Sequence, residues 1–218
     1  MQGLRIGRRG VCAAAGALVA APVLAQTAGG KPRVALKTGQ GLIVVELEAA
    51  KAPITTANFL RYAAAGHLEG ASFFRASRTE GAPTTGFIEG RIQNNPAKLF
   101  APIKHESTLQ TGLSHLDGTI SMARSGLGTA RVDFFICCGP VPSFDADPKG
   151  EGDNAGYAAF GAVVEGMEVV RAILALPTPG KARNPAMVGQ ILEPPVAILG
   201  LKRLANGPAP APADAKAG

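Results

Sequence analysis

The chain has 218 residues, of which 46% are hydrophobic and 17% are charged. This composition excludes an intrinsically disordered chain, and the length is enough for one domain with a sizeable core. The formal net charge is +6, but no basic patch is interleaved with aromatic residues. The charge therefore gives no ground for expecting a nucleic-acid partner.

Residues 1–25 have the composition of a secretory signal peptide. Three arginines precede an Ala-rich apolar run from Val11 to Ala21, and Val23-Leu24-Ala25 suits a signal peptidase. We expect cleavage after Ala25 and a periplasmic or secreted protein with no stable membrane insertion after processing. The alternative is a retained membrane anchor, for which the apolar run is short. The general secretory and the twin-arginine routes both stay open.

The rest of the chain divides into three parts. Residues 26–32 are a Gly-rich linker, and residues 33–205 carry the apolar patterns of one folded domain. Residues 206–218 form a Pro/Ala tail that cannot bury enough apolar surface to fold, so a disordered extension is expected.

Within the domain, β-rich runs alternate with turn residues. They predict eight strands, at 33–38, 42–47, 71–76, 87–90, 119–123, 132–138, 157–164 and 196–204. Gly39-Gln40-Gly41 joins the first two strands as a tight hairpin. Residues 78–85, 94–110 and 145–156 are expected to be loops.

Two helices are predicted between these strands. Pro53 begins the first, because a first-turn position needs no N–H, and Gly66 ends it; residues 57, 59, 60 and 64 are expected to face inward. The second spans 167–176, with residues 169, 170, 173 and 174 inward. No regular βαβ alternation occurs, so the fold class is mainly β. A closed eight-stranded antiparallel barrel capped by two α-helices fits, because closure removes exposed edges.

The adjacent Cys137 and Cys138 lie in the strand predicted at 132–138. Neighbouring side chains of a strand point to opposite faces, and a disulfide between them would distort the strand. We expect two free, largely buried thiols. A vicinal disulfide is the alternative, which an exported location would permit.

Five motifs follow one another along the chain. They are Ser72-Phe73-Phe74-Arg75, Gly118-Thr119-Ile120-Ser121-Met122-Ala123-Arg124, Val132-Asp133-Phe134-Phe135-Ile136, Gly156-Tyr157-Ala158-Ala159-Phe160-Gly161 and Val163-Val164-Glu165-Gly166-Met167. Together they resemble the cyclophilin-type peptidyl-prolyl cis-trans isomerases, from about Val34 to Leu204. The resemblance implies a monomeric isomerase without cofactor or metal. Its partners would be proline-containing peptides or unfolded protein clients, here exported proteins with X-Pro bonds.

The resemblance also implies roles for individual residues. Arg75 is the matching catalytic arginine, which would donate a hydrogen bond as amide resonance is lost. Phe135 matches the proline pocket, Ala123 the position at the substrate backbone, and Phe87 and Phe144 further pocket positions. Tyr157 matches a residue at the pocket edge; a barrel-end aromatic is the alternative for this position.

Three positions depart from the family pattern. Glu89 stands where a Gln orients the catalytic arginine, so we expect it to pair with Arg75 and to ionise more readily than a free Glu. Asp133 replaces another Gln, and Ser143-Phe144 replaces a Trp-Leu pair. The substitution at Glu89 and the missing Trp leave open an alternative function, a weakly catalytic or non-catalytic module that binds Pro-containing segments in a chaperone-like way.

Other motifs are weak. The three histidines lack metal-ligand spacing, and Gly150–Gly156 is too charged for a dinucleotide-binding turn and opens no helix. No Gly-x-Ser-x-Gly elbow of a hydrolase occurs.

Overall fold

The structure is a computed structural model that describes residues 30–92 and 96–205. The predicted signal peptide, all but the end of the linker, and the Pro/Ala tail lie outside the described residues, so the expectations about them stay predictions. No helix among the described residues is long and apolar enough to cross a membrane.

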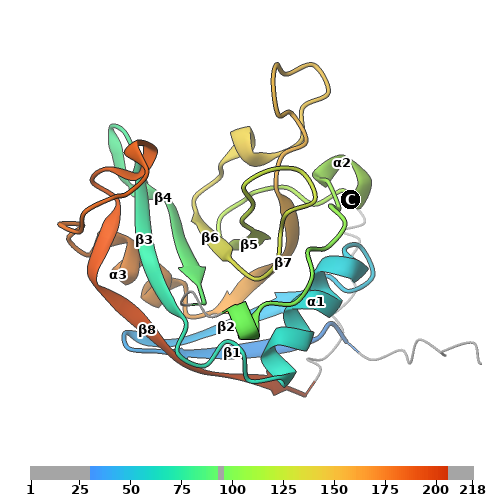
Figure 1. The fold of residues 1–218 in the computed structure, drawn as a ribbon, viewed down its shortest axis with the longest axis horizontal. Coiled ribbons are helices and arrows are strands. Elements are labelled where there is room, and N and C mark those ends of the chain that lie inside the picture. The colour runs from blue at the N-terminus through green and yellow to red at the C-terminus, as the bar shows by residue number, and fades with distance from the viewer. Residues whose placement is uncertain (1–29, 93–95, 206–218) are drawn as a thin grey trace, which may run out of the picture.

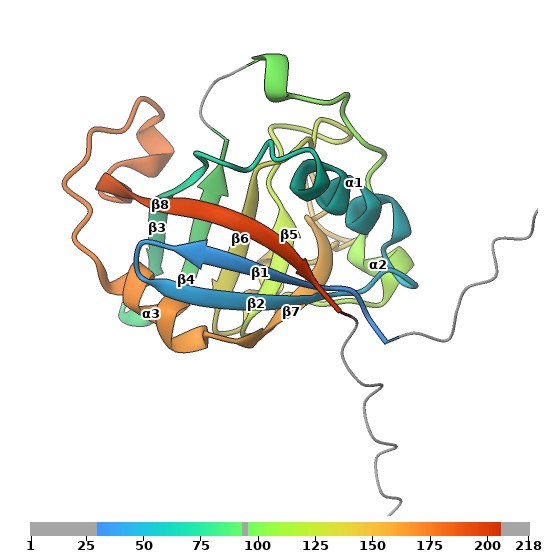
Figure 2. The ribbon, with the colours of Figure 1, turned by 90° about the horizontal axis from the view of Figure 1, so that it is seen from below.

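Eight antiparallel strands close into a barrel in the order β1-β2-β7-β5-β6-β4-β3-β8 (Figures 1 and 2). Their bounds are β1 Arg33–Thr38, β2 Gly41–Leu47, β3 Ser72–Thr79, β4 Ala82–Arg91, β5 Thr119–Met122, β6 Phe134–Cys138, β7 Ala158–Glu165 and β8 Ile191–Leu204. Every strand has two hydrogen-bonded neighbours, so no edge is left unpaired. The closed barrel predicted from the sequence is confirmed.

Three strands, β3, β4 and β8, are longer than predicted, because the prolines in β4 and β8 fall at irregularities of the sheet rather than ending the strands. The sequence predicts a loop at residues 78–85, but β3 runs to Thr79 and β4 begins at Ala82 after a two-residue turn. Pro83 is tolerated because it falls where the β3–β4 register shifts. The last strand begins at Ile191 rather than Val196, and its two prolines likewise lie in the stretch where the β3–β8 register shifts. At a bulge some backbone N–H groups make no hydrogen bond to the neighbouring strand, so proline, which has no N–H, fits there.

Both predicted helices are present, as α1 Pro53–Ala64 and α3 Met167–Ala175. A third, one-turn helix, α2 Thr108–Thr111, lies where the sequence predicts a loop; Ser107 accepts a hydrogen bond from the Gln110 N–H, and the left-handed Gly112 ends the helix. Short 3-10 turns occur at Pro96–Lys98, Pro142–Phe144 and Pro185–Met187.

The buried face of α1 differs from the expected one. Phe59 is buried as predicted, but Ala57 and Ala64 are exposed, while Tyr62 and the polar Thr55 and Asn58 are buried. Thr55 donates to the buried Glu106, and the Asn58 amide donates to the Arg131 carbonyl. The polar residues face inward because they find hydrogen-bond partners there.

Phenylalanines from α1 and three strands form the centre of the core. The Phe134 ring lies 5.6 Å from that of Phe59 and 5.8 Å from that of Phe73, and the Phe160 ring lies 5.3 Å from that of Phe59. Gly90 leaves room for Phe134, since a Cβ there would come within 2.9 Å of its ring. Phe134 thus faces the core and leaves the next residue to the other face, as the sequence predicts.

The two adjacent cysteines at the end of β6 are free and buried. Burial raises the pKa of Cys137 to about 12 and that of Cys138 to about 11. The prediction of two unlinked, buried thiols is confirmed.

Candidate active site

All seven residues predicted for the site line one cavity of about 410 Å³ on the outside of the barrel. They are Arg75, Phe87, Glu89, Ala123, Phe135, Phe144 and Tyr157. The structure therefore brings the whole set together, and the individual catalytic and binding roles stay predictions.

A β-bulge places the catalytic candidate. The register between β3 and its neighbours shifts between Phe73 and Arg75. As a result Phe73 and Ala76 both face the core, whereas Phe74 and Arg75 both line cavities on the outer face. Regular alternation would have put Arg75 on the same face as Phe73. Bulges commonly re-aim a side chain next to an active site.

Two side chains hold the Arg75 guanidinium in place. Its Nη1 donates to Glu89 Oε2 at 2.9 Å, and its Nε donates to Gln190 Oε1 at 2.8 Å. The guanidinium carbon lies 4.9 Å from the centre of the Phe87 ring. With 17% of its side chain exposed, Arg75 is fixed yet reachable, and three of its five N–H donors are free of these two bonds.

Glu89 pairs with Arg75 as predicted, but the expectation that it ionises more readily than a free Glu is wrong. Burial raises the pKa of Glu89 and outweighs the hydrogen bond and charge of Arg75 and the charge of Arg91, which act in the opposite direction. Only 8% of the residue is exposed, so the carboxylate loses most of its hydration.

A second, partly buried carboxyl belongs to Asp133, just before β6. Burial and the negative charge of Glu89 raise the pKa of Asp133 to about 6, against the charge of Arg91 and a hydrogen bond from the Ile92 N–H. Two of the family's neutral glutamine positions are thus occupied here by carboxyls with raised pKa values.

Four aromatic rings wall the cavity. Phe87 on β4, Phe135 on β6, Phe144 in the turn Pro142–Phe144 and Tyr157 before β7 have ring centres 5.1–5.6 Å apart in the contacting pairs. Phe144 contacts the other three rings, so it supplies the apolar wall at the place where the sequence lacks a Trp. An aromatic pocket of this kind suits the flat, apolar ring of proline.

Behind Phe135 lies a polar chain that no sequence motif indicates. His115 stacks on Phe135, with ring centres 5.8 Å apart, and its Nδ1 lies 2.6 Å from Asp145 Oδ1 and its Nε2 2.9 Å from Ser121 Oγ. Burial lowers the pKa of His115, while Asp145 opposes the shift. The order of the three residues is that of a hydrolase triad, but Ser121 is 0% exposed, so no substrate reaches its hydroxyl. The chain supports the pocket wall.

The far rim of the cavity comes from the segment between α3 and β8, which carries no sequence signal of a site. Asn184, Ala186 and Met187 line the cavity there. Gln190, which holds Arg75, also donates from Nε2 to the Ala186 carbonyl at 3.2 Å. No sequence pattern marks Gln190, because its partner lies 115 residues away.

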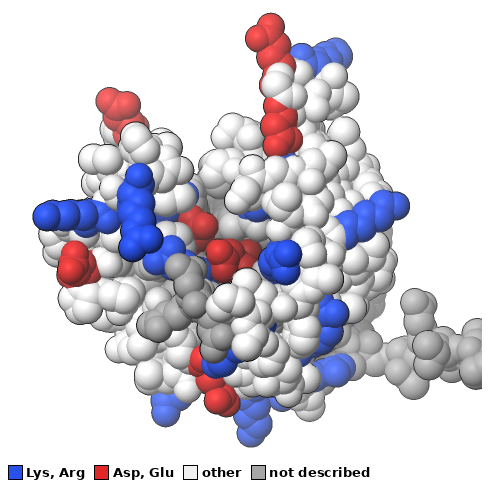
Figure 3. Space-filling view, in the orientation of Figure 1, with Lys and Arg blue, Asp and Glu red and all other residues white. Residues whose placement is uncertain are grey.

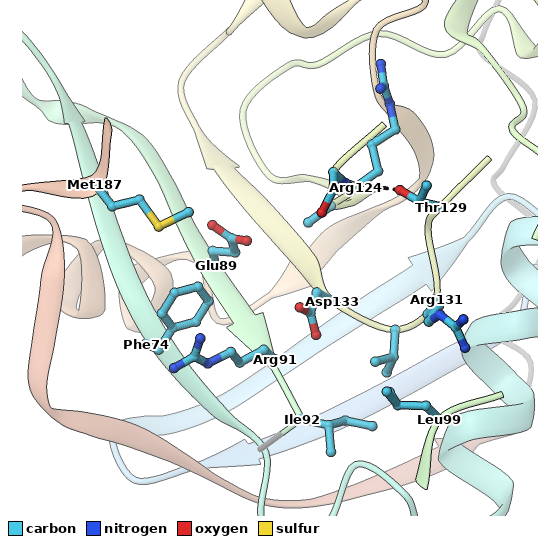
Figure 4. Close-up of a pocket in the computed structure, with 13 residues that line it drawn as sticks. Phe74, Glu89, Arg91, Ile92, Leu99, Arg124, Thr129, Arg131, Asp133 and Met187 are labelled. Atoms are coloured by element: carbon cyan, nitrogen blue, oxygen red, sulfur yellow. Dashed lines mark hydrogen bonds between the residues drawn. The ribbon is translucent and has the colours of Figure 1, made fainter. Parts of the chain in front are cut away.

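A larger cavity of about 510 Å³ continues from the aromatic one across Glu89 and Ala123. Figure 4 shows Asp133 lying between Arg91 and Arg131. Glu89 and Met187 line both this cavity and the aromatic one. Arg124 at its rim is ion-paired with Asp153 and donates to the Gly156 carbonyl. No group of three or more His, Cys, Asp or Glu side chains in the described ranges could hold a metal ion.

Comparisons with known proteins agree with this geometry. The family model "Cyclophilin type peptidyl-prolyl cis-trans isomerase/CLD" matches residues 33–193. A peptidyl-prolyl cis-trans isomerase of Acinetobacter baylyi is 35% identical over 164 residues, covering 75% of this chain and 80% of the relative. The isomerase cyp18 of Streptomyces antibioticus is 36% identical over 152 residues, with 69% and 87% covered.

A solved structure supports the fold. The cyclophilin-type isomerase of Cryptosporidium parvum superposes with a TM-score of 0.59 at 20% identity, covering 81% of this chain and 99% of that one. The chain belongs to the cyclophilin-type peptidyl-prolyl cis-trans isomerase family. Its enzyme class is peptidyl-prolyl cis-trans isomerase.

Proposed function

We propose that the protein isomerises X-Pro bonds of exported proteins while they fold, with Arg75 as the catalytic donor. The observation that carries the proposal is a guanidinium fixed by Glu89 and Gln190 at a cavity walled by aromatic rings. Cyclophilins bind proline-containing peptides and protein substrates, and the cavity offers a place for the proline ring among Phe87, Phe135 and Phe144.

The chemistry requires neither a nucleophile nor a base. Rotation about an amide bond is opposed by a barrier of about 18–20 kcal/mol, because the C–N bond has partial double-bond character. A donor that hydrogen-bonds the prolyl nitrogen stabilises the twisted state, in which the nitrogen lone pair is free, more than the planar one. Arg75 suits this task because it stays protonated and is already held in position, so little reorganisation is needed.

The roles of the other lining residues follow from their places. Glu89 and Gln190 orient Arg75, and the three phenylalanines exclude water from the proline ring. Ala123 lies at the junction of the aromatic cavity and the larger cavity, where a small side chain lets the client backbone pass. Tyr157 closes one end of the aromatic wall. We propose a monomer that needs no cofactor for this reaction.

The exported location is supported by the composition of residues 1–25. Protein recovered from the periplasm of an exporting bacterial host should have the intact mass of a chain that starts at Gln26. A soluble full-length product there, or activity confined to the cytoplasm, would contradict the proposal on location without touching the activity.

The alternative is a module that binds Pro-containing segments with little turnover. It is favoured by the carboxylate of Glu89, which partly compensates the charge that Arg75 would offer to the prolyl nitrogen. A protease-coupled isomerisation assay on a short Xaa-Pro peptide separates the two. Turnover well above the uncatalysed rate supports the isomerase; binding of the peptide without acceleration supports the module.

A further inference from the structure

A separate cavity of about 360 Å³ next to the aromatic one is lined by three cationic side chains and no carboxylate. The cations are Arg91, Lys181 and Arg183. Phe74 and Met187 also line the cavity. Met187 and Asn184 also line the aromatic cavity, so the two cavities share a wall. We call this space the basic cavity.

Among the described residues, none of the three cations forms a direct ion pair, although the charge of Arg91 acts at longer range on Glu89 and Asp133. Within residues 30–92 and 96–205, no carboxylate oxygen lies within 4.0 Å of the charged nitrogens of Arg91, Lys181 or Arg183. The nearby Arg75 and Arg124, by contrast, are each ion-paired. Three like charges facing one cavity repel one another, and an anion from outside would relieve that repulsion.

An aromatic contact holds Arg91 in place, whereas Lys181 and Arg183 are exposed side chains on a segment whose base is tied by hydrogen bonds. The guanidinium carbon of Arg91 lies 4.0 Å from the centre of the Phe74 ring, and Figure 4 shows the two stacked. Lys181 and Arg183 come from the segment between α3 and β8. This segment is tied at its base by Gly180 N–H to the Ile191 carbonyl at 3.0 Å and by Thr178 Oγ1 to the Gly189 carbonyl at 2.7 Å.

The surface view agrees with this local excess of positive charge. Figure 3 shows Lys and Arg side chains gathered on one side of the central hollow, over β3 and the segment between α3 and β8. Acidic side chains lie nearby but outside the basic cavity: Glu89 and Asp133 line the larger cavity, and Glu193 lines a cavity beyond Lys181. The positive excess is therefore confined to one side of the aromatic cavity.

We propose that the basic cavity is a subsite for an acidic side chain of the client, close in sequence to the target proline. The inference rests on the proposed isomerase function. An extended chain advances about 3.3–3.6 Å per residue, so a side chain one to three residues from the proline reaches an adjoining cavity. The carboxylate would replace solvent and counterions around Arg91, Lys181 and Arg183.

The test is a peptide series in which one residue is Glu, Gln or Lys, placed at each of the three positions on either side of the proline. Since exposed charge pairs contribute modestly, we expect kcat/KM for the Glu peptide to exceed that for the Gln peptide by about twofold to fivefold at one position, with Lys below Gln. The preference should shrink as salt is raised past about 0.15 M, where the Debye length is about 8 Å.

Matched variants locate the effect. In Lys181→Gln/Arg183→Gln the Glu-to-Gln ratio should fall towards one. In the control Lys202→Gln/Arg203→Gln, which removes the same charge from exposed positions at the other end of β8, the ratio should be that of the wild type. Each ratio is taken within one protein, so a general change of activity cancels. Equal ratios in the two double variants, or no preference at any position, would overturn the proposal.

Two further measurements distinguish a client subsite from a failure of the isomerase function and from a site for free anions. If the Gln peptides are not turned over at all, the isomerase function fails, and fluorescence anisotropy of labelled Glu and Gln peptides still tests the subsite. Inorganic phosphate should compete with the Glu peptide more strongly than with the Gln peptide. Phosphate binding without any preference for Glu peptides would make the basic cavity a site for free anions and would refute a client subsite.

Discussion

At the scale of single residues, the main feature is Arg75, the proposed catalytic donor, with a charged neighbour. Glu89 is nine-tenths buried and is bonded to Arg75, so the two side chains form one unit. Removing Arg75 alone would leave a buried carboxylate without its partner, which costs stability. Tests of Arg75 are therefore best made in a background in which residue 89 is neutral.

The first prediction concerns Arg75 in that background. Arg75→Ala/Glu89→Gln should lose about 10²–10³ in turnover relative to Glu89→Gln, about 2.7–4 kcal/mol, as for the loss of one preorganised donor. Isomerisation kinetics measure the change, circular dichroism checks the fold, and Arg203→Ala on exposed β8 is the control. A folded double variant with full activity would place the catalytic donor elsewhere.

The second prediction concerns Glu89 itself. Glu89→Gln keeps an acceptor for Arg75 and removes the opposing charge, so activity should equal or exceed that of the wild type at pH 7. Because burial raises the pKa of Glu89, wild-type kcat/KM should change on acidification, and this change should be absent in the variant. A loss of more than roughly tenfold, about 1.4 kcal/mol of barrier, would show that the negative charge is required.

The third prediction concerns Asp133 and pH. The pKa of Asp133 is about 6 in the folded protein, against 3.8 for an ordinary Asp, so the folded state binds the proton more tightly than the unfolded state does. The stability that this proton provides is complete below about pH 4 and is lost as pH rises through 6. Asp133→Asn should therefore be more stable than the wild type at pH 7 by about 1–3 kcal/mol, with a much smaller difference at pH 4.

Urea unfolding at the two pH values measures this difference. Glu151→Gln serves as the control, because it also removes one acidic charge, but from an exposed side chain. A variant that is less stable than the wild type at pH 7 would mean that Asp133 is stabilised by contacts outweighing its burial.

At the scale of elements, a distant carboxylate completes the start of α1. No side chain caps this helix locally, but the buried Glu106 accepts bonds from the N–H groups of Ile54 at 3.1 Å and Thr55 at 2.8 Å, and from the Thr55 hydroxyl at 2.7 Å. A helix start has unpaired N–H donors and a partial positive charge. Glu106 accepts hydrogen bonds from two of these donors, and its negative charge is attracted to the helix start. It also connects the loop before α2 to α1.

The fourth prediction follows from this cap. Glu106→Ala should cost about 2–3 kcal/mol, because it leaves buried donors without an acceptor, and Glu106→Gln should cost less because one oxygen remains. The melting temperature should fall by roughly 5–10 °C for the alanine variant. Exposed Glu69→Ala is the control, and equal melting temperatures for all three variants would show that the cap is dispensable.

At the scale of the whole molecule, the closed barrel provides a rigid support for a site built on its outer face.

The fifth prediction is that deletion of residues 207–218 leaves melting temperature and isomerase activity unchanged, because the segment has no apolar periodicity. Thermal unfolding of the full chain and the shortened chain measures this. A drop of several degrees would show that the tail packs on the barrel.

Features that depend on local patterns could be predicted from the amino-acid sequence alone. Period-two apolar runs, glycines at turns and Pro53 at a helix start predicted the strands, the two main helices and the closed barrel. The resemblance of the ordered motifs around Arg75, Ala123 and Phe135 to the cyclophilin family implied the members of the aromatic cavity. Such signals lie within a few residues of each other, so they can be recognised along the chain.

Features that depend on residues far apart in the chain were decided only by its folding in three dimensions. The bulge that turns Arg75 outward arises from pairing with β4 and β8, and Gln190 and His115 have partners that no spacing reveals. The inward face of α1 and the raised pKa of Glu89 depend on burial, which only packing sets. The basic cavity likewise exists because β4 and the segment before β8 meet in space.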